Sequence, residues 1–135
     1  MFKFLEKHKV AMVYFPLLFY WILLLTATSL PAADLPSIGT IDKVNHLVAY
    51  FGLSVLLNLC LLFQLKYVTL YKKAFLLAFL IVILYGALDE LHQMFIPGRS
   101  AEVLDWTADA VGALLGVILV FKLVKKFKYK SPKFN

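Results

Sequence analysis

Four long apolar stretches constrain the fold of this chain more than any other feature of its sequence. They cover approximately residues 10–30, 44–65, 74–95 and 103–124. An α-helix of about 20 residues is about 30 Å long, which matches the hydrocarbon core of a membrane. The sequence therefore predicts an all-α membrane protein, built as a bundle of four transmembrane helices.

Composition and charge favour a membrane protein over a soluble one. Of the residues, 62% are hydrophobic and 16% are charged, against about one half and one quarter in soluble proteins. The length of 135 residues predicts a single domain, residues 1–135. The net charge of +6 would also suit nucleic acid, but the basic residues flank the apolar stretches and leave no soluble basic face. We therefore expect the lipid bilayer, and no nucleic acid, as a partner.

The first apolar stretch has an alternative interpretation as part of a secretory signal peptide. In that case MFKFLEKHK would be the basic region, and LPAAD would hold the cleavage site. However, the apolar run is longer than the 7–15 residues typical of signal peptides. This length favours a first helix that is retained in the protein.

The distribution of lysine and arginine predicts the orientation of the bundle. Loops on the cytoplasmic side of a membrane carry an excess of these residues. In this chain they gather in the N-terminal segment, in the 66–73 connection and in the tail, whereas the 31–43 and 96–102 connections hold only Lys43 and Arg99. We therefore expect both termini to be cytoplasmic. The basic tail, residues 125–135, is expected to be disordered or to lie on the membrane surface.

Almost all of the charged side chains within the predicted helices lie near the predicted outer end of the bundle. They come from three of the predicted helices, together with one amide: Asp42, Asn45, His46, Asp89, Glu90, Asp105 and Asp109. A charge in mid-membrane costs about 2.5–3.5 kcal/mol. Such groups persist where a cation, shared protons, a metal or water compensates them. Because the helical faces that carry them can converge, the sequence predicts a polar pocket that opens outward.

The fourth predicted helix carries acidic and small residues on one stripe. Asp105, Asp109, Gly112 and Gly116 lie within about 60° of one another at about 100° per residue. Small residues at this spacing let two helices approach closely. The stripe should therefore face protein rather than lipid, with Gly112 and Gly116 serving helix packing.

Several interpretations of the polar residues are compatible with the sequence. Arg99 lies in the turn between the two acidic pairs, where it could bridge carboxylates on both helices, whereas Glu102 is expected to be solvated. The acids and Arg99 could form an ion-pair network that fixes the hairpin, or a site for a polar ligand. A metal held by His46 and the carboxylates is a further alternative. Because no HxxxH or HExxH spacing is present, we expect neither a metal nor another cofactor.

Two segments resemble the VanZ-like family of bacterial membrane proteins. DKVNHLVAYFGLS is similar to the family pattern D-K-x-x-H-x-x-x-Y/F, and DELHQMFIPGRSAEVLDWTADAVGALLG is similar to a longer pattern of acids, Gln, Arg and glycines. The resemblance covers Asp42–Gly116. The positions carried over are Asp42, Lys43, His46, Asp89, Glu90, Gln93, Arg99, Asp105, Gly112 and Gly116. Asp109 stands where the family often has asparagine.

The resemblance implies a multi-pass protein of the bacterial inner (cytoplasmic) membrane. The family is named for a member linked to low-level resistance to teicoplanin, a glycopeptide, but resistance does not transfer to every member. Our leading hypothesis is a non-hydrolytic protein of the cell envelope. Its pocket would bind a lipid head group or a membrane-protein partner through Asp42, Lys43, His46, Asp89, Glu90, Gln93, Arg99, Asp105 and Asp109. The alternatives are an enzyme acting on a lipid-linked envelope substrate and a structural subunit of a larger envelope complex.

Overall fold

The computed structural model describes residues 1–31, 39–131 and 133–134, and the regular secondary structure within these ranges is helical. The elements along the chain are α1 (Phe2–Lys7), a π-helical turn η1 (Val10–Tyr14), α2 (Phe15–Thr28), α3 (Gly39–Phe63), α4 (Val68–Lys72), α5 (Ala74–Gln93) and α6 (Val103–Lys126). Four helical segments are long and apolar enough to cross a membrane: Val10–Thr28, Asp42–Phe63, Ala74–Gln93 and Val103–Lys126. This confirms the predicted all-α membrane protein with four transmembrane helices.

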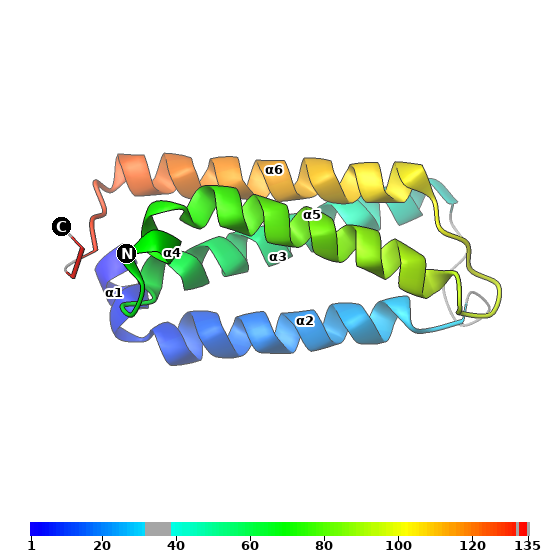
Figure 1. Ribbon diagram of the computed structural model, residues 1–135, viewed down its shortest axis with the longest axis horizontal. Helices are drawn as coiled ribbons and strands as arrows, with labels where there is room; N and C mark the ends of the chain where they lie inside the picture. The colour runs from blue at the N-terminus through cyan, green and yellow to red at the C-terminus, as the bar shows by residue number, and fades with distance from the viewer. Residues whose placement is uncertain (32–38, 132, 135) are drawn as a thin grey trace.

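The long helices run side by side, so that the bundle has two distinct ends (Figure 1). Both termini lie at one end together with α1 and α4, and we call this the terminal end. At the opposite end, residues 94–102 connect α5 to α6, and we call this the hairpin end. The charged residues that the sequence places at one depth therefore belong to the hairpin end.

Helix α3 packs closely against α6, because two glycines of α6 present no side chain to it. A Cβ atom at Gly112 would collide with the backbone carbonyl oxygen of Leu47. One at Gly116 would lie 2.8 Å from the carbonyl oxygen of Phe51. The hydroxyl group of Ser54 donates a hydrogen bond of 2.8 Å to the carbonyl oxygen of Ala113 across the same interface. Close backbone approach of this kind is a common way for helices to associate in membranes.

Helix α2 lies at the edge of the bundle and leaves most of its surface exposed, as expected of a helix that faces lipid. Leu17 and Leu24 are buried in the core of the bundle, and two further contacts connect α2 to α3 and α5. The hydroxyl group of Tyr20 donates a hydrogen bond of 3.0 Å to the carbonyl oxygen of Ala49 on α3. The ring of Trp21 meets that of Tyr85 on α5 edge to face, with ring centroids 5.3 Å apart.

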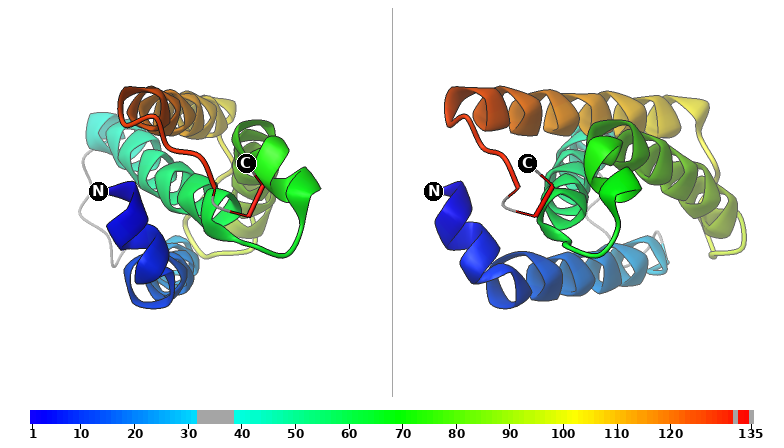
Figure 2. Two further views of the ribbon diagram at one scale, coloured as in Figure 1. Left: turned by 90° about the vertical axis from the view of Figure 1, so that its left-hand side faces the viewer. Right: turned by 60° about the vertical axis from the view of Figure 1, so that its left-hand side comes forward.

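The part of the basic tail that the structure describes packs against the terminal end of the bundle. Helix α6 continues to Lys126, and the chain then turns back over the terminal end (Figure 2). The Tyr129 ring stacks on Phe2 at 5.1 Å, and the backbone N–H of Ser131 donates to the hydroxyl group of Tyr71. Burial, together with the nearby carboxylate of Glu6, raises the pKa of the Tyr129 hydroxyl group. Tyr129 stands between Lys128 and Lys130. Burial of its aromatic ring away from water makes this packing favourable.

The lysines at the terminal end predict that this end faces the cytoplasm. We expect a membrane-impermeant maleimide to label Ser100→Cys in intact cells and to label Lys133→Cys only after the membrane is permeabilised. Both positions are exposed, and Cys60 is first replaced by alanine so that the introduced thiol is the single reactive one. The opposite labelling pattern would show that the bundle is inverted.

Candidate functional site

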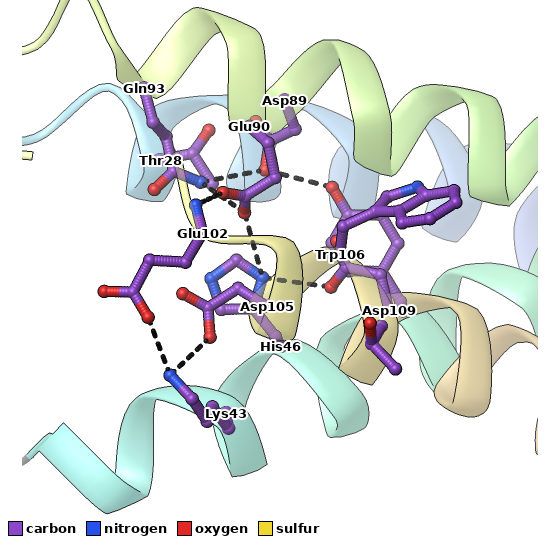
Figure 3. A network of polar contacts seen from close by, with 12 residues as sticks. Thr28, Lys43, His46, Asp89, Glu90, Gln93, Glu102, Asp105, Trp106 and Asp109 are labelled. Atoms are coloured by element: carbon purple, nitrogen blue, oxygen red, sulfur yellow. Dashed lines mark hydrogen bonds and ion pairs between the residues drawn. The ribbon is translucent and has the colours of Figure 1, made fainter. Parts of the chain in front are cut away.

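The hairpin end contains a buried polar network made by side chains of α3, α5 and α6 (Figure 3). Its buried members are His46, Asp89, Glu90, Gln93, Asp105 and Asp109. Asp109 is 0% exposed, and the other three carboxylates are at most 6% exposed. Because charges without partners are costly inside a protein and inside a membrane, the contacts of these carboxylates decide what the site can do.

His46 lies at the centre of the network and joins all three helices. Its Nδ1 atom is 2.9 Å from Oδ1 of Asp109 on α6 and 3.8 Å from Oε1 of Glu90 on α5. Gly86 makes room for Asp109, since a Cβ atom at residue 86 would lie 2.8 Å from Oδ2. A glycine on α5 thus allows a carboxylate of α6 to be buried between α3 and α5.

A second group of contacts surrounds Asp89. The hydroxyl group of Tyr50 on α3 donates to Oδ2 of Asp89 at 3.0 Å. Gln93, one turn after Asp89, approaches the same oxygen at 3.4 Å and Oε1 of Glu90 at 3.5 Å. The amide group of Gln93 therefore lies between the two carboxylates and separates them.

Arg99 does not bridge the acids of two helices, which corrects the expectation from the sequence. Its Nε atom donates to Oε1 of Gln93 at 3.0 Å, and Nη2 donates to the same oxygen. The hairpin is fixed differently: Oε2 of Glu90 accepts the backbone N–H of Glu102 at 2.8 Å. The chain reverses at Gly98, whose φ of 75° suits glycine. This turn brings the Arg99 side chain to Gln93 instead of to a carboxylate.

Lys43, rather than Arg99, pairs with carboxylates, and both of these lie at the start of α6. Its Nζ atom is 2.9 Å from Oε2 of Glu102 and 3.1 Å from Oδ1 of Asp105, and so it connects α3 to the start of α6. The Glu102 side chain is 49% exposed, as expected for a solvated residue, but it is also paired with Lys43. Because the Lys43 side chain is solvent-exposed, water and salt screen its ion pairs. Lys43 therefore sets the geometry of the network more than its stability.

A cavity of about 140 Å³ lies beside this network, between α2 and α3. Its polar lining residues are Thr28, Asp42, Asn45, His46, Tyr50 and Arg99. Leu24, Ala27 and Ala49 form its apolar wall. The cavity has room for a small polar group of a ligand, with the remainder of the ligand outside it.

The structure divides the residues that the sequence singled out into two sets. Asp42, His46 and Arg99 line the cavity. The remaining six, Lys43, Asp89, Glu90, Gln93, Asp105 and Asp109, belong to the network behind it. Two polar lining residues, Thr28 and Tyr50, were not assigned to the pocket from the sequence, although Tyr50 stands at the Y/F position of the family pattern. Tyr50 had a signal, since it follows His46 by one helical turn, whereas Thr28 had none.

Two groups of side chains in the described part of the chain have the spacing of metal ligands. One is formed by Asp42, His46 and Asp105, and the other by His46, Glu90 and Asp109. Within each group, one ligand atom from each residue lies within 4.8 Å of the others. His46 is common to both groups, so it would be central to any metal site.

Comparison with known proteins identifies the family. The family model described as VanZ/LLP1 matches residues 4–125, which is nearly the whole chain. No curated protein and no solved structure matches. The match agrees with the resemblance found in residues 42–116 and extends it over all four apolar helices. The chain belongs to the VanZ/LLP1 family and is a multi-pass membrane protein.

Proposed function

We propose that the protein binds the phosphate-bearing head group of an envelope lipid in the cavity between α2 and α3. The observation that carries this proposal is the position of Arg99. It is the single arginine of the chain and lines a cavity in a largely apolar bundle. Among the residues that the structure describes, Arg99 has no carboxylate partner. Its positive charge is therefore available to an anion.

The chemistry of the cavity suits a phosphate group with polar substituents. A guanidinium group binds phosphate oxygens through parallel N–H donors, and Gln93 holds that of Arg99 in one orientation. Asp42 and Asn45 of α3 also line the cavity. Asp42 would accept hydrogen bonds from hydroxyl or amino groups of the ligand, and Asn45 would accept or donate them. Leu24, Ala27 and Ala49 would contact its first apolar atoms.

The position of the cavity suits a ligand that remains in the membrane. The cavity lies at the hairpin end, where head groups would be at the depth of the helix termini. Helix α2 leaves most of its surface exposed, so acyl chains can lie beside it. In the proposed orientation this leaflet is the outer one of the bacterial inner membrane.

Binding is tested with purified protein in detergent micelles that contain no added metal. Native mass spectrometry measures the occupancy of a polyprenyl phosphate and of the corresponding uncharged polyprenol. We expect Arg99→Gln to weaken phosphate-lipid binding at least about tenfold, or about 1.4 kcal/mol. The control Lys72→Gln removes one exposed positive charge at the terminal end and should leave binding unchanged within about twofold. Equal binding by Arg99→Gln and wild type, or equal binding of the two lipids, would disprove the proposal.

The contact between His46 and Asp109 favours a second candidate, an enzyme that acts on the same class of lipid. A carboxylate that holds one ring nitrogen of a histidine leaves the other nitrogen to act as a general base. His46 also lines the cavity. The test is to incubate a lipid-linked precursor with the protein and to search for a cleaved product by mass spectrometry. The enzyme hypothesis predicts such a product with the wild-type protein and none with His46→Gln.

A further inference from the structure

The buried network contains more carboxylates than cationic side chains. Lys43 forms an ion pair with the buried carboxylate of Asp105. Among the residues described, no other lysine or arginine pairs with a buried carboxylate. Lys43 shares its charge with the exposed Glu102. Among these residues, Glu90 and Asp109 have His46 as their one potentially cationic partner. The side-chain partners of Asp89 are the neutral Tyr50 and Gln93. Three nearly buried carboxylates and one imidazole carry a net negative charge unless protons or a metal ion neutralise them.

The geometry at His46 favours a metal ion. His46, Glu90 and Asp109 come from α3, α5 and α6, and they point toward one another (Figure 3). Their ligand atoms lie within 4.8 Å of one another, as is required for coordination of one ion. The distances from Nδ1 of His46 to the two carboxylate oxygens, 2.9 and 3.8 Å, resemble those between neighbouring ligands of one metal.

A separate observation concerns the second oxygen of Asp109. The Asp109 side chain is 0% exposed, yet Oδ2 has no hydrogen-bond partner in the described part of the protein. Buried carboxylate oxygens nearly always have a partner. A metal ion bound by this carboxylate would give Oδ2 an electrostatic partner.

We propose that His46, Glu90 and Asp109 bind one divalent transition-metal ion, with Zn²⁺ or Mn²⁺ as the class that fits. One imidazole nitrogen with carboxylate oxygens is a ligand set that both ions accept. Ca²⁺ fits less well, because it takes 6–8 oxygen ligands. The metal would neutralise the network and connect three helices. This site does not depend on lipid binding, although an ion at His46 would also lie next to the cavity.

The test uses the full chain, purified in detergent and stripped with a chelator. ZnCl₂ and MnCl₂ are titrated separately by calorimetry, and bound metal is counted by elemental mass spectrometry after desalting. We expect one ion per chain. We expect a loss of metal affinity of at least about 100-fold in each of the variants His46→Gln, Glu90→Gln and Asp109→Asn. Loss of a residue that only hydrogen-bonds to a metal ligand typically lowers the affinity by about 10- to 100-fold. Glu102→Gln, which removes a carboxylate outside the group, should change the affinity less than about threefold.

Two further measurements protect the test against variants that fold poorly. Pulsed electron paramagnetic resonance of Mn²⁺ in the wild-type protein should show coupling to one imidazole nitrogen. Asp42→Asn, which belongs to the other potential ligand group, should keep the metal. The proposal is overturned if the wild-type protein binds neither ion stoichiometrically, if no imidazole coupling is seen, or if Asp42→Asn loses the ion while Glu90→Gln keeps it.

The design also separates this site from the proposed lipid site. Arg99→Gln should keep the metal stoichiometry of the wild type while it loses the phosphate lipid. Lipid binding is measured without added metal, so its failure would leave the metal result intact. Failure of metal binding alone would mean that protons neutralise the carboxylates, and lipid binding would be unaffected by that outcome.

Discussion

Replacement of His46 by leucine should lower the free energy of unfolding by about 3–5 kcal/mol, which is the usual cost of leaving a buried charge without its partner. Asp109 is 0% exposed, and the contact of 2.9 Å with His46 is the one hydrogen bond that its side chain makes among the described residues. Leucine fills similar space but offers no donor, so the carboxylate stays buried and unpaired. The measurement is unfolding by SDS in mixed micelles, in the presence of a chelator so that metal does not contribute.

Two variants distinguish the loss of this contact from a general loss of packing. The double variant His46→Leu with Asp109→Leu should recover most of the stability, because an apolar pair of similar volume often replaces a buried ion pair without cost. His92→Leu serves as the matched control. His92 is half-buried at the same end and makes one hydrogen bond to Ser29, so its replacement should cost about 1 kcal/mol. Equal losses for His46→Leu and His92→Leu would contradict the central role of His46.

Gly112→Ala should destabilise the bundle by about 3 kcal/mol, at the upper end of the cost of overpacking a core. The new Cβ atom would meet the backbone carbonyl oxygen of Leu47, and a backbone atom within a helix cannot move aside. Helices α3 and α6 would have to separate. The separation would also loosen the contact between His46 and Asp109, because the same two helices carry these residues.

The control for this variant is Gly52→Ala on α3. A Cβ atom there would lie 2.7 Å from the hydroxyl oxygen of Tyr20, which is the far end of a side chain that can rotate. Its cost should be about 1 kcal/mol, offset in part by the higher helix propensity of alanine. Unfolding in mixed micelles and the monodisperse fraction in size-exclusion chromatography measure both variants. A Gly112→Ala protein as stable as Gly52→Ala would show that α3 and α6 do not approach as closely as described.

The long helices could be predicted because a run of apolar residues is a property of neighbouring positions in the sequence. Apolar runs of about 20 residues predict spans whatever their neighbours are. The apolar spans of the structure end within about two residues of the prediction, although helix α3 already begins at Gly39 rather than near residue 44. The short helices α1 and α4 and the folded tail were not predicted. They depend on aromatic contacts such as Phe2 with Tyr129 and Tyr71 with Phe134, which join residues far apart in the chain.

The depth of the charged residues in the membrane follows from the sequence, because it depends on their position along a helix. The buried stripe of α6 also follows from it, because residues three and four positions apart lie on the same face of a helix. Which cation meets which carboxylate does not follow from either property. Lys43 and Arg99 stand at similar depth, yet Lys43 pairs with Asp105, and Arg99 binds Gln93. The backbone turn at Gly98 and the distance between α3 and α6 decide this pairing, since a hydrogen bond requires its atoms to be placed to within a few tenths of an ångström.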